Sequence, residues 1–152
     1  MGRLASGLAA GAVGTSVLNA ATYLDMALRG RPSSSVPEAD VEKLRASLGV
    51  PLGDDPDKAA TRKEGVGALM GLLTGFAGGA AFGIVRPFAP RVGWPAAAAL
   101  TGVAIMLATD ATSTAMGTTD PRSWSPGDWA SDLVPHLVYG AGVVLTFDAL
   151  EG

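Results

Sequence analysis

The chain has 152 residues, enough for one domain; 48% are hydrophobic, only 16% are charged, and the mean hydropathy is positive. The formal net charge of −3 gives no reason to expect a nucleic-acid partner, which calls for a clustered basic patch. The lack of cysteine excludes disulfides and thiol chemistry, and the single histidine excludes a multi-histidine metal centre, so we expect no metal and no cofactor.

Four stretches of the chain contain no Asp, Glu, Lys or Arg: 4–24, 65–85, 92–109 and 133–147. A bilayer core needs about 20 helical residues, which the first two stretches supply directly. The third reaches this length if its helix continues past Asp110, and the fourth needs Asp132 or Asp148 in its end turns. We therefore predict an all-α integral membrane protein, a four-helix transmembrane bundle forming the single domain 1–152, with helices at about 4–27, 64–86, 94–117 and 128–149.

A soluble bundle with an alanine-rich core is the alternative. It fits the second stretch poorly, because that stretch has no polar face for water. A cleaved signal peptide fits the N-terminal stretch poorly, since Asn19, Thr22 and Asp25 interrupt what should be an apolar core.

The first helix carries small or polar residues at every fourth position, beginning with Gly7, Gly11 and Thr15 and continuing to Asn19 and Tyr23. Small residues let helix backbones approach closely in a membrane. This stripe therefore predicts a close helix–helix contact along one face.

The loop 28–63 is the one long connection between the predicted helices. Ser35 and Glu38 stand at capping-box spacing, and a short helix through about Leu48 should follow. We expect this helix to pack on the protein's own helices as a lid; a place on the membrane surface or against a partner is the alternative.

The second transmembrane helix has glycine at every fourth position. Asp55 before Pro56 is typical of a helix start, so the helix can begin near 56 and project beyond the membrane. The row predicts a groove that receives the stripe of the first helix in a tight hairpin; another protein or a second copy is the alternative occupant. A dinucleotide-binding glycine loop is disfavoured because no strand precedes it. The row is Gly67, Gly71, Gly75, Gly79 and Gly83.

The fourth helix also has a start signal, with Ser125 before Pro126 and Asp128 at capping-box spacing. Trp94, Trp124 and Trp129 stand at helix entrances, where interfacial aromatic residues belong.

Lysine and arginine predict the orientation. The loop 28–63 holds seven of the eleven, whereas the 86–91 turn holds two. The positive-inside rule then places this loop and the 118–125 loop in the cytoplasm and both termini outside the cell (inner) membrane. The seven are Arg29, Arg31, Lys43, Arg45, Lys58, Arg62 and Lys63.

Ionisable residues gather at the predicted cytoplasmic end of the bundle. Ionisable residues within membrane helices often mark proton or ion paths, and histidine changes charge near neutral pH. Asp110 with His136 is the sharpest form of this hypothesis. Structural hydrogen bonding and a pocket for a small molecule or lipid headgroup are the alternatives. The candidate residues are Asn19, Asp25, Asp110, Asp132 and His136.

The segments LNAATYLDMALRGRPSSSVPE (18–38) and DWASDLVPHLVYG (128–140) resemble a group of small hypothetical membrane proteins of actinobacteria. The resemblance covers most of the chain. It implies a multi-spanning inner-membrane protein and assigns no catalytic residue or ligand.

The leading functional hypothesis is a non-enzymatic accessory or scaffold subunit that packs through its glycine-rich helix faces. Its partners would be membrane lipid and another membrane protein or a second copy of itself. The alternative is a small proton-coupled carrier or ion-conducting oligomer that uses Asp110 and His136. A lipid-acting enzyme with Asp132 and His136 as acid and base is a remote third, because no nucleophile supports it.

Overall fold

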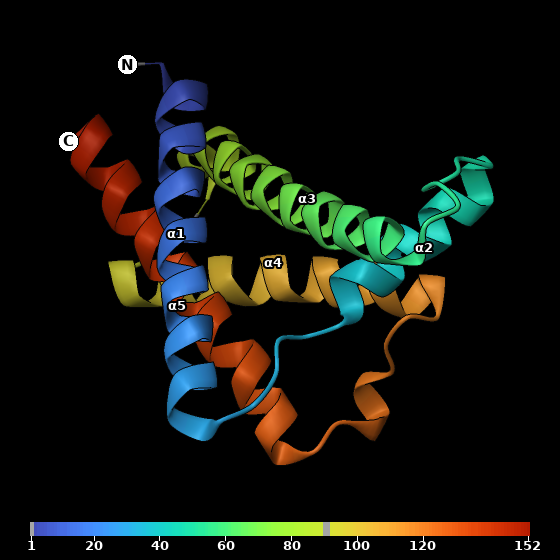
Figure 1. Cartoon of the computed structure of the whole chain (residues 1–152). Coiled ribbons are helices and arrows are strands. Elements are labelled where there is room, and N and C mark those ends of the chain that lie inside the picture. Colours follow the sequence, from blue (N-terminus) through green and yellow to red (C-terminus); the bar gives the residue numbers. More distant parts are fainter. Residues whose placement is uncertain (1, 90–91) are drawn as a thin grey trace.

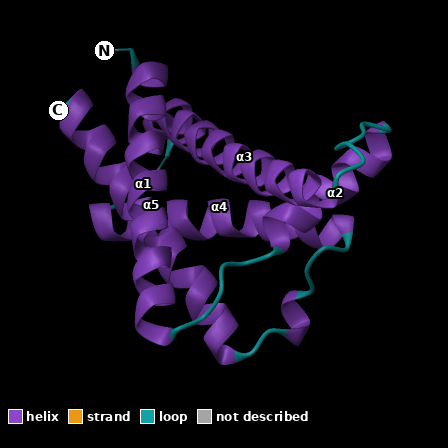
Figure 2. Cartoon of the chain, in the orientation of Figure 1, coloured by secondary structure: helices purple, strands orange, loops and turns teal. Residues whose placement is uncertain are grey.

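The computed structural model describes residues 2–89 and 92–152, and the chain forms helices joined by loops, with no strand in these ranges (Figures 1 and 2). Four of the helices are long and apolar enough to cross a membrane. The all-α prediction and the number of long apolar helices are therefore confirmed. The elements are α1 (Arg3–Arg29), α2 (Val36–Leu48), α3 (Pro56–Val85), the 3₁₀ turn η1 (Arg86–Phe88), α4 (Trp94–Met116), the 3₁₀ turn η2 (Pro121–Ser123) and α5 (Pro126–Glu151).

Two of the predicted helix starts have the expected caps. The Asp55 carboxylate accepts hydrogen bonds from the backbone N–H of Asp57 and Lys58, at 3.1 and 3.2 Å, so α3 begins at Pro56. At the start of α5, the Ser125 and Asp128 side chains form a capping box. Both helices are therefore longer than their apolar stretches, because polar residues cap an extra turn or more.

The predicted capping box at Ser35 is wrong. Ser35 has φ −92° and ψ 1° instead of an extended conformation, and its side chain caps no N–H. The neighbouring Ser34 hydroxyl accepts a hydrogen bond from the N–H of Val36 at 3.3 Å instead. The helix still begins at Val36, since Pro37 in its first turn favours helical backbone.

The four long helices pack in the order α3, α1, α5, α4, and α3 touches α4 only slightly. In Figure 1, α1 and α5 run side by side in opposite directions, whereas α3 and α4 cross this pair at steep angles. Both chain termini lie at one end. The end of α1 and the start of α5 lie at the other, and α2 contacts both α3 and α4.

Tyr139 on α5 lies at the centre of the core. It is 1% exposed and packs with Ala10 of α1 and with Val143 and Phe147 of its own helix. Phe147 meets Phe82 of α3 edge to face, with ring centroids 5.3 Å apart. This cluster joins α1, α3 and α5.

Glycines bring the backbones of α1 and α3 into contact. A Cβ added to Gly7 would lie 2.6 Å from the carbonyl oxygen of Gly79, and one added to Gly11 would lie 2.6 Å from that of Gly75. A Cβ added to Gly83 would meet the carbonyl of Arg3. The first part of the α1 stripe, Gly7, Gly11 and Thr15, therefore lies in the groove formed by the second half of the α3 row. The stripe does not pack as a whole, because Tyr23 at its other end is 63% exposed.

The first half of that row lies elsewhere. Gly67 faces Pro37 of α2, and a Cβ added to Gly71 would meet no atom of the described residues within 4 Å. The expectation that the whole row packs as one groove is therefore wrong for Gly67 and Gly71. The reason is the steep crossing, which carries the start of α3 away from α1 (Figure 1).

The contact between α4 and α5 also depends on glycine. A Cβ on Gly102 would meet the carbonyl of His136, and a Cβ on Gly140 would meet the carbonyl of Ala98. These glycines belong to no regular row, so the sequence pattern does not indicate the contact. They set the spacing between the two helices that carry Asp110 and His136.

The carboxylate of Asp40 links α2 to α4 by hydrogen bonds. The Ser113 hydroxyl of α4 donates to Asp40 at 2.7 Å, and the Thr118 hydroxyl just beyond α4 also donates to Asp40. Val41 is buried, and Pro37 lies over Gly67. The short helix thus packs on the protein's own helices.

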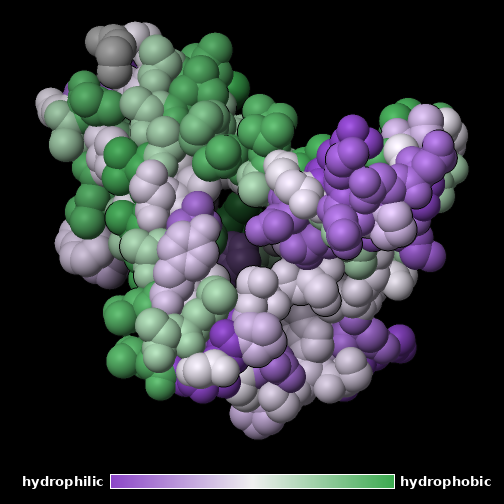
Figure 3. All heavy atoms as spheres, in the orientation of Figure 1, coloured by the Kyte–Doolittle hydropathy of each residue, from purple (hydrophilic) through white to green (hydrophobic). Residues whose placement is uncertain are grey.

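Polar and apolar surface separate on the molecule. In Figure 3, hydrophilic residues gather over α2 and the adjoining start of α3, and at the end where α1 meets the start of α5. Hydrophobic residues dominate the end with the termini. A hollow lies between the α1 side and the α2 side of this face.

Candidate functional site

Three ionisable side chains from two helices meet between α4 and α5. Asp110 projects from α4, and its carboxyl lies close enough to Asp132 and His136 of α5 to interact with both side chains. We call Asp110, Asp132 and His136 the polar cluster. The contacts at Gly102 and Gly140 hold the two helices close enough for it to form.

The orientation of His136 is fixed by its own helix. Its Nδ1 lies 2.7 Å from the carbonyl oxygen of Asp132 and 3.4 Å from the Oδ1 of the same residue. The side chains of His136 and Asp132 are mostly buried, at 15% and 24% exposed. Pro135, one position earlier, lacks the N–H that would bond the carbonyl of Ser131, one residue before the carbonyl that His136 contacts.

Asp132 is incompletely satisfied. Its Oδ2 is buried and has no hydrogen-bond partner among the residues that the structure describes. A buried carboxylate oxygen without a donor is costly, and the group within range is another carboxyl, that of Asp110. A proton placed between the two carboxyls would convert a repulsive contact into a hydrogen bond.

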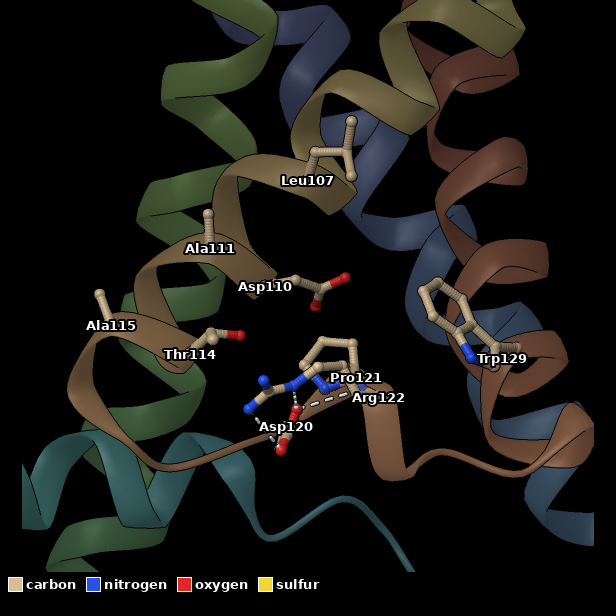
Figure 4. Close-up of a pocket in the computed structure, with 9 residues that line it drawn as sticks. All are labelled: Leu107, Asp110, Ala111, Thr114, Ala115, Asp120, Pro121, Arg122 and Trp129. Atoms are coloured by element: carbon tan, nitrogen blue, oxygen red, sulfur yellow. Dashed lines mark hydrogen bonds and ion pairs between the residues drawn. The ribbon is translucent and has the colours of Figure 1, made fainter.

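Asp110 also lines an open pocket of about 520 Å³ between α4, α5 and the connection that joins them. Figure 4 shows Asp110 pointing from α4 into this space, with Trp129 of α5 on the opposite side. We call this space the Asp110 pocket. Its lining is Leu107, Asp110, Ala111, Thr114, Ala115, Asp120, Pro121, Arg122 and Trp129.

The loop side of the Asp110 pocket carries an ion pair. The Arg122 guanidinium donates to both carboxylate oxygens of Asp120, at 2.9 and 3.1 Å (Figure 4). The hydrogen bonds from Arg122 hold the pKa of Asp120 below its ordinary value of 3.8. The two charges therefore offset each other, and Asp110 supplies the unbalanced charge of the pocket lining.

Trp129 is held by a second aromatic side chain. Its ring meets that of Trp124 edge to face, with centroids 5.0 Å apart, and the Trp124 indole N–H donates to the Thr119 hydroxyl at 3.1 Å. Trp129 remains 41% exposed. Trp129 therefore gives the pocket an aromatic wall, and Trp124 packs against this ring.

Two of the five candidate residues lie outside the polar cluster. Asp25 accepts a hydrogen bond from Ser131 at 3.0 Å and pairs with Arg29 and Arg31, so it joins the end of α1 to the start of α5. Asn19 is half-buried on α1, and the interactions of the polar cluster do not include it. Asp25 is engaged by arginines, so the polar cluster is formed from α4 and α5.

The sequence hypothesis omitted the aromatic wall and the ion pair of the pocket. Trp129 lies three residues before Asp132 on α5, so helical spacing already places both on neighbouring parts of one face. Nothing in the residue pattern indicates that Asp120 and Arg122 fold back beside Asp110. Their position follows from the 3₁₀ turn η2, which the Asp120 carboxylate caps by accepting the N–H of Arg122.

Within residues 2–89 and 92–152, no group of three or more His, Asp or Glu side chains is placed to hold a metal ion. Comparison of the chain with protein-family models, with curated proteins and with solved structures found no match. A function must therefore be argued from the geometry of the polar cluster and the Asp110 pocket.

Proposed function

We propose that the chain is a multi-pass protein of the inner membrane, with α1, α3, α4 and α5 as its spans. The most apolar 18-residue windows of these helices are only 17–33% buried within the chain. Large side chains such as Leu69, Leu73 and Leu100 are at least 60% exposed. Acyl chains would cover this surface, whereas in water it would drive aggregation.

The orientation follows from the distribution of basic residues. The end formed by α2, the start of α3 and the start of α5 contains most of the lysines and arginines, and hydrophilic surface gathers there in Figure 3. We place the loop 28–63 in the cytoplasm and both termini outside. The polar cluster then lies in the cytoplasmic half of the membrane.

Within this frame, we infer that the polar cluster is a proton-binding site and that the protein is a small proton-coupled carrier. The Asp110 carboxyl lies beside Asp132, whose buried Oδ2 has no hydrogen-bond partner among the described residues, and this arrangement carries the proposal. Two neighbouring carboxyls that share one proton are more stable than the same two carboxyls with both ionised. His136 beside them can accept that proton or return it.

The arrangement also offers the proton a route. Asp110 lines the open pocket, whereas Asp132 and His136 lie behind it and are mostly buried. A proton from the pocket would reach Asp110 first and then pass to the Asp132–His136 pair. Four helices are few for a carrier, so the active form would be an oligomer of this non-enzymatic chain.

The accessory-subunit hypothesis is the second candidate, and one observation favours it. The α3 span is 17% buried, the least of the four, and the face of α3 at Gly71 is open. A second membrane protein could cover it. However, α1 occupies the groove at Gly75 and Gly79, so a partner could bind only the remaining faces of α3.

Purified protein reconstituted in liposomes with an internal pH dye tests the carrier proposal. We expect a pH gradient to dissipate faster than in empty liposomes and expect Asp110→Asn to abolish the difference. Asp148→Asn is the matched control, because Asp148 lies at the far end of α5 and pairs with Arg86. Equal flux through Asp110→Asn and wild type would overturn the proposal.

The same preparation separates the second candidate. Mass spectrometry of the protein purified in mild detergent would detect a stoichiometric partner. A bound second protein together with no proton flux would favour the accessory role, whereas a homo-oligomer with flux would favour the carrier.

A further inference from the structure

We propose that the Asp110 pocket binds an organic cation with an apolar body, and that this cation and a proton compete for the Asp110 carboxylate. This inference rests on the proposed proton-binding function and names the class of ligand that the same site exchanges. It follows from the charge, the walls and the position of the pocket.

The charge of the pocket selects a cation. Asp120 and Arg122 form a doubly hydrogen-bonded pair and offset each other, so Asp110 supplies the net negative charge among the lining residues. Asp132 adds a second carboxyl directly behind Asp110. An anionic ligand would therefore meet carboxyl groups and a guanidinium that is already paired.

The walls select an apolar body. Leu107, Ala111 and Ala115 present aliphatic surface from α4, and Trp129 presents an aromatic surface from α5 (Figure 4). A cation beside an indole gains a cation–π attraction of about 0.5–2 kcal/mol, depending on how far it is desolvated. The contact with Trp124 holds the Trp129 ring in place, so little ordering is needed on binding.

These walls argue against an inorganic cation. A bare metal ion needs several oxygen or nitrogen ligands, and the described residues offer no such group of three. An organic cation needs only one carboxylate and apolar or aromatic contact, and a volume of about 520 Å³ admits a molecule of that size.

The charged groups around Asp110 set the direction of coupling. Asp132 and His136 face it from α5, Asp120 and Arg122 lie on the loop side, and Asp40 of α2 reaches α4 one turn further along at Ser113. The adjoining α3 has no charged residue between Glu64 and Arg86. Protonation of Asp110 removes the charge that attracts the ligand, so cation binding should weaken as the pH falls and should release a proton.

The experiment uses tetraphenylphosphonium as the probe and purified full-length protein in mild detergent. Tetraphenylborate is the matched control, since it has the same shape and the opposite charge. Equilibrium dialysis measures both affinities for wild type, Asp110→Asn, Trp129→Leu and the Asp148→Asn control. Folding of each variant is checked by circular dichroism and gel filtration.

We expect wild type to bind the cation and not the anion, with an affinity that falls on acidification. Asp110→Asn and Trp129→Leu should each weaken binding about tenfold, the loss that accompanies removal of one charge-assisted or cation–π contact. Asp148→Asn should bind like wild type, and Asp110→Asn should lose the pH dependence.

Equal binding of the two probes, or unchanged affinity in Asp110→Asn, would overturn the inference. If proton flux in liposomes still depends on Asp110 in that case, the proton site stands and only the ligand class is wrong. If flux is also independent of Asp110, the proposed function fails with it.

Discussion

The phenol hydroxyl of Tyr139 on α5 donates a hydrogen bond of 2.7 Å to the backbone carbonyl oxygen of Gly75 on α3. Gly75 has no side chain to shield this carbonyl, and the same glycine makes room for Thr15 of α1. One position of α3 therefore accepts close contacts from two neighbouring helices. Since α3 and α5 touch little otherwise, this hydrogen bond is a main link between them.

We expect Tyr139→Phe to lower the stability of the protein in detergent by about 1 kcal/mol, the usual net contribution of one hydrogen bond within a helical membrane protein. Tyr23→Phe is the matched control, because Tyr23 is 63% exposed. Thermal unfolding followed by circular dichroism measures both. Equal melting temperatures for the two variants would show that the Tyr139 hydrogen bond contributes nothing.

The contact between Gly79 and Gly11 gives a second prediction. A Cβ on Gly79 would meet the backbone of Gly11 and the carbonyl of Gly7, and backbone atoms cannot move aside cheaply. We expect Gly79→Ala to destabilise the protein by about 1–3 kcal/mol, as overpacking of a close contact usually does. The measurement is thermal unfolding together with gel filtration in detergent.

Gly71→Ala is the control for this substitution, since Gly71 belongs to the same row and its Cβ would meet open space. It should be neutral or slightly stabilising, because alanine favours the helix. Similar losses for both variants would mean that glycine matters for the helix itself and not for the contact with α1.

These two positions show how far the sequence determines the fold. A repeat of four predicts which face of α3 is small, and hence the contact with α1 at Gly75 and Gly79. It does not predict the crossing angle, which depends on how side chains of both helices interlock. Gly71 therefore lies outside the contact with α1, although it follows the same four-residue repeat as Gly75 and Gly79.

The polar cluster shows a similar division. Helical spacing on α5 predicts that Asp132 and His136 share a face, and the sequence hypothesis already paired His136 with Asp110. The approach of α4 that completes the cluster depends on Gly102 and Gly140, two isolated glycines whose importance appears only in the packed structure. The position of Asp120 and Arg122 beside Asp110 could not be predicted either, because it depends on the 3₁₀ turn η2.

The packing of α2 on α3 can be tested by disulfide cross-linking. The chain has no cysteine of its own, so only the introduced pair can react. A Cβ on Gly67 would lie 3.0 Å from the Cβ of Pro37, close to the separation of about 3.5–4.5 Å that a disulfide requires. Pro37→Cys with Gly67→Cys should therefore form a disulfide on mild oxidation, detected by gel mobility. Pro37→Cys with Gly65→Cys should not, because Gly65 faces open space. Failure of the first pair would contradict the position of α2.

Acid should loosen the same contact. Glu42 of α2 accepts a hydrogen bond from the Arg45 Nε at 3.0 Å and lies 3.6 Å from the Lys63 Nζ of α3. The Arg45 side chain, helped by the charge of Lys63, holds the pKa of Glu42 below its ordinary value of 4.5. Because the folded pKa is the lower one, the stabilisation is complete above the ordinary value and is lost as the pH falls through the folded value.

We expect the protection of 36–48 against hydrogen exchange, taken relative to the intrinsic rate at each pH, to fall at low pH in wild type and to fall less in Glu42→Gln. The effect should be small and should shrink in high salt, since the pair is exposed. Identical pH profiles for the two proteins would mean that this ion pair does not hold α2.

The shared proton between Asp110 and Asp132 is the central claim, and infrared spectroscopy of the purified protein tests it most directly. A protonated carboxyl has its own carbonyl stretching band, separate from that of a carboxylate. We predict that such a band appears at mildly acidic pH in wild type and in Asp148→Asn, and that both Asp110→Asn and Asp132→Asn lack it. Absence of the band in wild type, or its persistence in both single variants, would contradict the account.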